Sequence, residues 1–138
     1  MTWPEKYLGI PWLSGGRVLE RGLDCWGLLR HIYYVEFDIE LSEHAVPIGT
    51  LATGDSLIEH EKETHAWFEI DDVTPGDVVA LGNAGGFSHV GVYVEVPEPS
   101  IIHIARDRTS CIASLRTLVR QGFHRIKYYR HVDRNTDR

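Results

Sequence analysis

The segment that begins at Cys25, and the short apolar segments after it, restrict the fold of this chain most. Between residues 25 and 36, positions 25, 28, 29, 32 and 36 lie on one side of a helix. Asp24 or Gly22 is a reasonable N-cap, so Cys25 is expected in the first helical turn. The preceding residues 11–22 contain three glycines and are expected to form a loop.

Five short apolar segments follow the helix and are separated by turn residues. They cover residues 78–81, 88–95, 101–105, 110–115 and 123–129. In residues 88–95, Val90, Val92 and Val94 alternate with other residues, which predicts a strand with one buried face. Cys111 lies in the fourth segment and is expected in the core. Because one helix precedes several strands joined by short turns, the sequence predicts an α+β fold with the helix packed on an antiparallel β-sheet.

Length and composition predict one globular domain. The chain has 138 residues, of which 43% are hydrophobic and 25% are charged. We expect a single domain over residues 1–138, with an acidic insertion at about 40–72 that is helical near 55–63. The first residues do not have the pattern of a signal peptide, and no segment approaches the length of a membrane span. The protein is therefore expected to be made in the cytoplasm without a signal peptide.

The charge distribution argues against a nucleic-acid partner. The net charge is -6, with -12 in residues 1–105 and +6 in residues 106–138. The total field repels phosphate, so we interpret the basic part as a solvated face, with docking to an acidic partner or to an anionic polymer as the alternative. Two cysteines are too few for a disulfide scaffold or a four-cysteine zinc site. No metal and no cofactor are expected.

Cys25 is the candidate nucleophile because of its predicted place at the start of a helix. The unpaired backbone N–H groups and the positive end of the helix dipole stabilise a thiolate there. The alternative is a buried cysteine that acts as a small apolar residue, which is the commoner role of a lone cysteine.

Two histidines favour the catalytic interpretation. His89 and His103 lie in consecutive predicted strands, at positions of the same parity if these strands form a hairpin. They would then project from the same face of the sheet, and the helix that begins at Cys25 is the expected cover of that face. Such an arrangement combines a nucleophile, a base and a group that orients the base.

Four blocks of sequence resemble, in order, the motifs of the NlpC family (NlpC/P60) of cell-wall cysteine peptidases. They are residues 22–28 (GLDCWGL), 75–79 (PGDVV), 88–93 (SHVGVY) and 102–105 (IHIA), and residues 8–17 resemble the loop before the catalytic cysteine. The resemblance implies a papain-like fold and hydrolysis of amide bonds that involve D-amino acids in peptidoglycan stem peptides. It implies Cys25 as the nucleophile, His89 as the base and His103 as the third catalytic residue.

Further residues are candidates for binding the substrate, namely Asp24, Trp12, Tyr7 and Ser88. The Cys25 backbone N–H is a candidate oxyanion donor, and Trp12 and Tyr7 are candidates for the second donor. Trp12 stands where the family often has Tyr, and its indole donates a hydrogen bond but cannot accept one. Asp24 either caps the helix or binds a substrate amine, and the cap is favoured because Asp is common there.

The short form of the chain resembles the versions of the family that are encoded in bacteriophage tail modules. This implies tail-tip proteins as partners and a place in the virion or the host cytoplasm, with action on the cell wall. Two other functions stay open. One is a structural tail or assembly protein that retains the fold as a binding module. The other is a papain-like amidase or acyltransferase, although a lipid-directed enzyme would need an apolar anchoring segment, which the sequence lacks.

Overall fold

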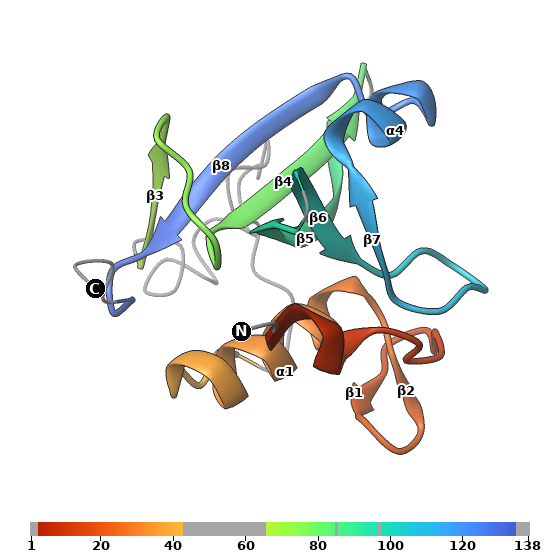
Figure 1. Ribbon diagram of the computed structural model, residues 1–138. Coiled ribbons are helices and arrows are strands. Elements are labelled where there is room, and N and C mark those ends of the chain that lie inside the picture. Colours follow the sequence, from red (N-terminus) through yellow and green to blue (C-terminus); the bar gives the residue numbers. More distant parts are fainter. Residues whose placement is uncertain (1–2, 43–65, 85, 97, 135–138) are drawn as a thin grey trace.

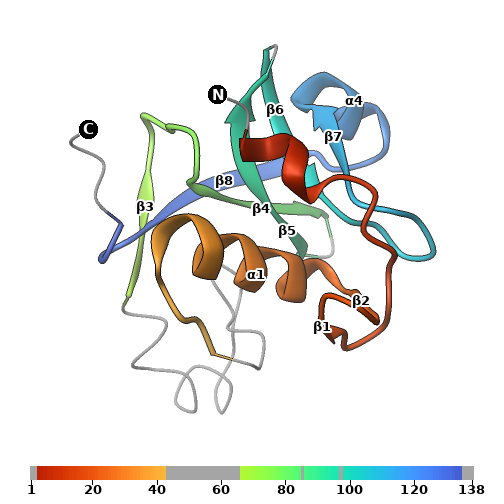
Figure 2. The ribbon, with the colours of Figure 1, turned by 60° about the horizontal axis from the view of Figure 1, so that its bottom comes forward.

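The computed structural model describes residues 3–42, 66–84, 86–96 and 98–134. In these residues a six-stranded antiparallel sheet has the order β3-β8-β4-β5-β6-β7. Helix α1 (Cys25–Phe37) crosses one face of this sheet (Figure 1, Figure 2). The predicted α+β fold, with a helix that starts at Cys25 packed on an antiparallel sheet, is therefore confirmed.

The sheet strands largely follow the predicted segments. They are β3 (Trp67–Ile70), β4 (Val78–Asn83), β5 (Gly86–Glu95), β6 (Pro99–His103), β7 (Cys111–Ser114) and β8 (Arg125–His131). The predicted loop 11–22 contains a small hairpin of β1 (Arg17–Val18) and β2 (Gly22–Leu23), and a 3₁₀ helix, η1 (Trp3–Tyr7), precedes it. β3 lies at the end of the predicted acidic insertion, where no strand was expected. Most of that insertion, including the predicted helix near 55–63, lies outside the described residues.

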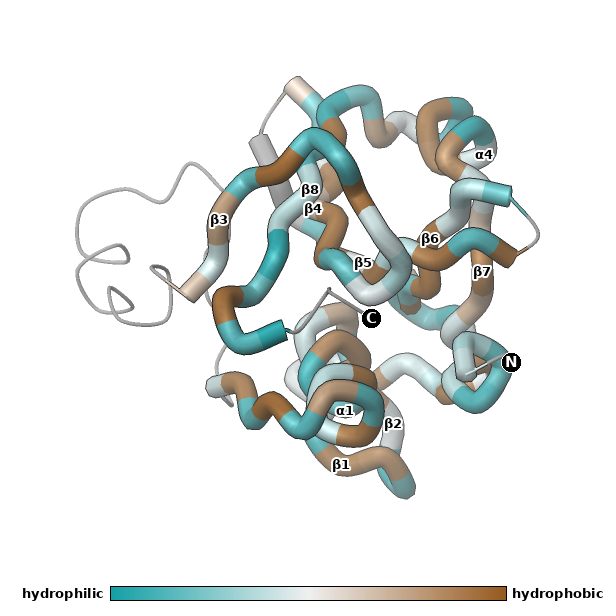
Figure 3. Tube along the Cα trace, turned by 60° about the vertical axis from the view of Figure 1, so that its left-hand side comes forward, coloured by the Kyte–Doolittle hydropathy of each residue, from teal (hydrophilic) through white to brown (hydrophobic). Residues whose placement is uncertain are grey.

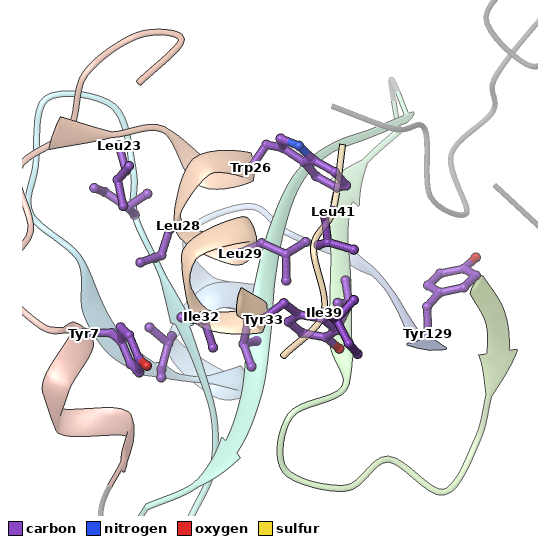
Figure 4. Packing of buried hydrophobic residues seen from close by; sticks show 14 of the residues in the cluster. Tyr7, Leu23, Trp26, Leu28, Leu29, Ile32, Tyr33, Ile39, Leu41 and Tyr129 are labelled. Atoms are coloured by element: carbon purple, nitrogen blue, oxygen red, sulfur yellow. The ribbon is translucent and has the colours of Figure 1, made fainter. Parts of the chain in front are cut away.

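Local hydrogen bonds explain where α1 begins and ends. The Asp24 side chain accepts a hydrogen bond from the Gly27 backbone N–H, so Asp24 is the N-cap. At the other end Asp38 adopts a left-handed conformation with φ of 56°, and its N–H donates to the Tyr33 carbonyl. Figure 4 shows Leu28, Leu29, Ile32 and Tyr33 of α1 pointing into one hydrophobic cluster with residues of the sheet.

The central strands are buried on both faces, not on one face as the sequence predicts. On one face Val92 and Val94 pack under α1, whereas Tyr93 faces a second cluster with Leu118. Leu118 belongs to α4 (Leu115–Arg120), a helix that the sequence did not predict and that begins where the strand segment 110–115 was expected to continue. Figure 3 shows hydrophobic stretches on α1 and on the central strands between the two helices.

A buried ion-pair cluster anchors the turn before β4. The Asp77 side chain is fully buried and accepts hydrogen bonds from the Thr74 backbone N–H at 2.8 Å and from Arg130 Nη2 at 2.8 Å. Arg134 also donates to Asp77. These contacts tie the 75–79 motif to the last strand, β8, and to the chain beyond it.

Candidate active site

Cys25 is the first residue of α1 and its side chain is partly buried. The backbone N–H groups of Val90, Trp26 and Cys25 itself are directed at its sulfur. Val90 directly follows His89 in β5, so the sulfur lies beside the strand position that carries the candidate base. The ladder between β5 and β6 reaches only as far as the pair Val92–Ile102, so residues 89–91 of β5 lie beyond it.

The two candidate histidines contact each other. His89 Nε2 lies 2.9 Å from His103 Nδ1, and the two rings are nearly perpendicular at 82°. The prediction that the two histidines project from the same face of a hairpin, because their strand positions have the same parity, therefore places them correctly relative to each other. Because Nε2 of His89 is engaged with His103, its Nδ1 is the nitrogen left to take a proton from a nucleophile.

The expectation that α1 covers the histidine face is wrong. His89 pairs with Leu81 in the β4–β5 ladder, and Leu81 belongs to the hydrophobic cluster on the face away from α1. Instead, the His89 ring stacks on Phe123, with ring centroids 5.5 Å apart and planes 18° apart. Helix α1 lies on the opposite face and brings Cys25 to β5 at Val90.

Phe123 is a residue of the site that the sequence does not reveal. It lies between α4 and β8, far from the histidines in sequence. Its position depends on the strand order, in which β8 lies beside β4 and β4 beside β5. The sequence does show an aromatic residue at the start of a predicted strand. It does not show the strand order, which is needed to place that residue beside His89.

Burial keeps both the thiol and the base neutral near pH 7. Burial, with a smaller contribution from the neighbouring His103, lowers the pKa of His89 from 6.5 to about 4. Burial and the Asp24 charge raise the pKa of Cys25, while the N–H of Val90 opposes this rise. The resting site therefore holds a thiol and a neutral imidazole, which suits general-base activation of the thiol.

Asp24 is occupied as the helix cap. Its Oδ1 accepts hydrogen bonds from the Gly27 backbone N–H at 2.7 Å and from Arg17 Nη1 at 2.7 Å. The favoured interpretation of Asp24 as a cap therefore agrees with the structure, and the carboxylate also fixes the loop before α1. A Cβ on Gly27 would collide with the carbonyl oxygen of Gly16, so Gly27 allows this loop to pack against the helix.

The structure does not bring Tyr7 to the cysteine. The Tyr7 hydroxyl donates to Glu36 in the last turn of α1, and burial raises its pKa strongly. Because α1 rises about 1.5 Å per residue, Glu36 lies about 16 Å along the helix from Cys25. The Tyr7 hydroxyl is thus placed too far away to be the second oxyanion donor.

Trp12 lies closer to the start of α1. It forms a parallel bridge with Leu23, two residues before Cys25, and its backbone N–H donates to the Arg108 carbonyl at 3.0 Å. The Arg106 guanidinium lies 5.6 Å from the centre of the Trp12 ring. The side chain of Ser88, the other predicted substrate-binding residue, lies outside the described part of the structure.

Cys111 is exposed, so its expected place in the core is wrong. It begins β7, which is one of the two edge strands of the described sheet and pairs only with β6 among the described strands. Its register partner is His103, and its sulfur lies 3.7 Å from His103 Nε2.

Neither metal-binding nor membrane-spanning features occur in the described part of the chain. No group of three His, Cys, Asp or Glu side chains there is arranged to hold a metal ion. None of the described helices has the length and apolar character needed to cross a membrane.

Solved structures share this fold. The NlpC/p60 domain of the peptidoglycan hydrolase SagA matches 91% of this chain and 89% of its own, with a TM-score of 0.60 and 19% identity. A protein from Staphylococcus aureus, described as similar to lipoprotein of the NLP/P60 family, matches 88% of this chain and 37% of its own, with a TM-score of 0.55 and 23% identity. These likenesses confirm the papain-like NlpC/P60 fold.

Sequence comparisons agree with the fold. The chain is 31% identical over 91 residues to the gamma-DL-glutamyl hydrolase of Bacillus subtilis, a match that covers 64% of this chain and 19% of that protein. The chain thus corresponds to a small part of that relative. Residues 9–128 match the NlpC/P60 family, and this range contains the cysteine and both histidines. With the Cys–His–His arrangement of a cysteine hydrolase in place, the chain belongs to the NlpC/P60 family.

Proposed function

We propose that the chain is a cysteine hydrolase in which Cys25 attacks an amide carbonyl and His89 serves as its base. One observation carries this proposal: the Cys25 sulfur, at the start of α1, lies beside the position of His89 in β5, and His89 Nε2 contacts His103 Nδ1 at 2.9 Å. His89 Nδ1 takes the thiol proton as the sulfur bonds to the carbonyl carbon. Its Nε2–H donates to His103 Nδ1, which orients the ring and stabilises its positive charge.

The remaining steps use the backbone at the helix start. The Cys25 backbone N–H, which has no acceptor within the helix, stabilises the oxyanion of the tetrahedral intermediate. The His89 imidazolium then returns its proton to the leaving amine as the C–N bond breaks, which leaves a thioester on Cys25. Water, deprotonated by His89, attacks the thioester, and the thiolate departs and is reprotonated.

We infer peptidoglycan stem peptides with γ-D-glutamyl amide bonds as the substrate class. A relative is named for gamma-DL-glutamyl bonds, and a solved structure of the same fold is named a peptidoglycan hydrolase. The exposed Arg106 and Arg108 add support, because they place positive charge beside Trp12 in a chain with a net charge of -6. Such cations can pair with the carboxylates of an acidic peptide.

Synthetic stem peptides test the substrate class. Peptides with D-Glu linked through its γ-carboxyl, and matched peptides linked through its α-carboxyl, are incubated with the protein and analysed by mass spectrometry. We expect cleavage of the γ-linked peptides alone, loss of cleavage in Cys25→Ala, and a several-fold higher KM in Arg106→Gln. Equal cleavage of both linkages would contradict the γ-glutamyl assignment. No cleavage of either peptide series would favour the binding-module alternative.

Delivery within a bacteriophage tail tip is a separate proposal, and it rests on the resemblance of the sequence alone. In that case the protein acts on the wall of the infected cell from the virion. Mass spectrometry of purified particles tests this placement. Absence of the protein from the particles would contradict it and leave the chemistry of Cys25 unaffected.

A further inference from the structure

The series of side-chain contacts that starts at His89 continues beyond His103. His89 Nε2 contacts His103 Nδ1 at 2.9 Å, and His103 Nε2 lies 3.7 Å from Cys111 Sγ. Both nitrogens of His103 are therefore engaged, one toward the base and one toward an exposed thiol. The proposed function assigns no role to Cys111.

The strand register places Cys111 at this point. His103 and Cys111 are partners in the β6–β7 ladder, and side chains that are directly opposite each other lie on the same face within contact distance. Gly91 leaves the space beside this pair open, since a Cβ there would lie 3.3 Å from the His103 Cβ. The thiol is thus held against the outer nitrogen of His103 by backbone pairing.

The proton positions on His89 and His103 follow from the proposed role of His89 as the base. His89 can take the Cys25 proton only if its Nδ1 is bare, so its single proton is on Nε2 and is donated to His103 Nδ1. His103 Nδ1 must then be an acceptor, which leaves the His103 proton on Nε2, facing Cys111 Sγ. If His103 carried its proton on Nδ1 instead, it would donate to His89 Nε2 and force the His89 proton onto Nδ1.

We propose that Cys111 is a positioning residue, whose sulfur accepts the His103 Nε2–H and so selects the tautomer that keeps His89 a base. Burial raises the pKa of the Cys111 thiol against the opposing charge of Arg108, so the group is a neutral thiol near pH 7. A neutral sulfur is a weak acceptor, and the expected effect on turnover is correspondingly modest, about 2- to 10-fold. The inference rests on the roles proposed for Cys25 and His89.

Histidine tautomers can be measured without any substrate. Long-range ¹H–¹⁵N correlation spectra of the full chain distinguish Nδ1–H from Nε2–H rings, and His103→Gln and His89→Gln variants assign the signals. We expect both rings to be Nε2–H tautomers at pH 7 in the unmodified protein. Cys111→Ala should shift His103 toward the Nδ1–H form, and Cys111→Ser, which keeps an acceptor, should retain more of the Nε2–H form.

Kinetics provide the second readout. In Cys111→Ala we expect kcat to fall by about 2- to 10-fold with KM unchanged, because a tautomer change removes active molecules without altering substrate contacts. Cys111→Ser should recover part of the loss. The melting temperature serves as the control for folding and should stay close to that of the unmodified chain, since Cys111 is exposed.

An Nδ1–H tautomer of His103 in the unmodified protein, or an unchanged tautomer in Cys111→Ala, would overturn this inference. If the spectra agree with it but no stem peptide is cleaved, the proposed substrate fails and the positioning role of Cys111 stands. If peptides are cleaved but the tautomers do not respond to Cys111, the proposed substrate stands and the positioning role of Cys111 fails.

Discussion

His89 shows how the surroundings of one residue set its chemistry and its response to pH. The ring stacks on Phe123 and contacts His103, and its pKa falls from 6.5 to about 4. In the unfolded chain the same imidazole titrates near 6.5. Between these two values the unfolded state binds more protons than the folded state.

The folded state should therefore lose stability as the pH falls from about 6.5 toward 4. His89 contributes up to roughly 3 kcal/mol to this loss, which is complete below about pH 4. Urea unfolding at several pH values measures it, and His89→Gln should flatten the dependence. His124→Gln, at an exposed position, serves as the matched control and should leave it unchanged. If the free energy of unfolding depends on pH equally in His89→Gln and in the unmodified chain, the low pKa of His89 is contradicted.

Gly91 is a second residue whose surroundings decide its identity. A Cβ at this position would collide with Ile101 Cγ2 and lie 2.8 Å from the Ile102 carbonyl oxygen. Gly91→Ala should therefore push β6 and His103 away from His89 and lower stability by about 1–3 kcal/mol. Hydrolysis rates and urea unfolding measure both effects. Gly9→Ala strains a left-handed backbone with φ of 79° but meets no neighbour within 4 Å, so as a control it should lower stability and still retain activity. Full activity in Gly91→Ala would show that the spacing between β6 and His89 does not matter.

The sequence is informative about these residues only where the chemistry is local. Cys25, His89 and His103 are predictable because a helix start and strand parity are features of short segments. Phe123 and Cys111 are not, because their roles depend on which strands are neighbours and on the register of the β6–β7 ladder. The position of α1 relative to the histidines likewise needs the complete sheet.

At the scale of elements, α1 depends on its cap. Asp24 accepts the Gly27 N–H and binds Arg17, and its charge also raises the pKa of Cys25. Asp24→Ala should cost about 1 kcal/mol of stability through loss of the cap. Asp24→Asn retains a good capping side chain without the charge, so it should keep most of that stability while the pKa of Cys25 falls.

Alkylation by iodoacetamide measures the second effect. The rate at Cys25 is followed against pH by peptide mass spectrometry, which separates Cys25 from Cys111. The midpoint of this profile should lie at lower pH in Asp24→Asn than in the unmodified protein. A midpoint that stays in place or rises would show that the Asp24 charge does not act on the thiol.

The elements themselves were predicted unevenly. The helix at Cys25 and the five strands from β4 to β8 have apolar patterns and were expected, although the segment of β7 was predicted to continue where α4 begins. α4 was not, because its six residues are too few for a helical period, and its start depends on Ser114, whose side chain accepts from the Thr117 N–H. β3 has two exposed residues in four and pairs only with β8 among the described strands, so its sequence carries little pattern.

At the scale of the molecule, the Asp77 cluster joins the middle of the chain to its last strand. Replacing a fully buried carboxylate leaves Arg130 and Arg134 without their partner. Asp77→Ala should therefore lower the free energy of unfolding by about 3–5 kcal/mol. Urea unfolding tests this, with the exposed Asp71→Ala as the control, which should change stability by less than about 0.5 kcal/mol. Equal stability of the two variants would show that the cluster is not a major support of the fold.

The candidate site lies where residues 89–91 of β5 extend beyond the β5–β6 ladder, with Cys25 reaching Val90 from the α1 side and the histidines on the other face of the sheet. Digestion of purified peptidoglycan, followed by mass spectrometry, tests most directly whether this assembly is catalytic. We predict new amine and carboxylate ends with the unmodified chain and with His124→Ala, and none with Cys25→Ala or His89→Ala. New ends that persist in Cys25→Ala would contradict the account, because the nucleophile would then lie elsewhere.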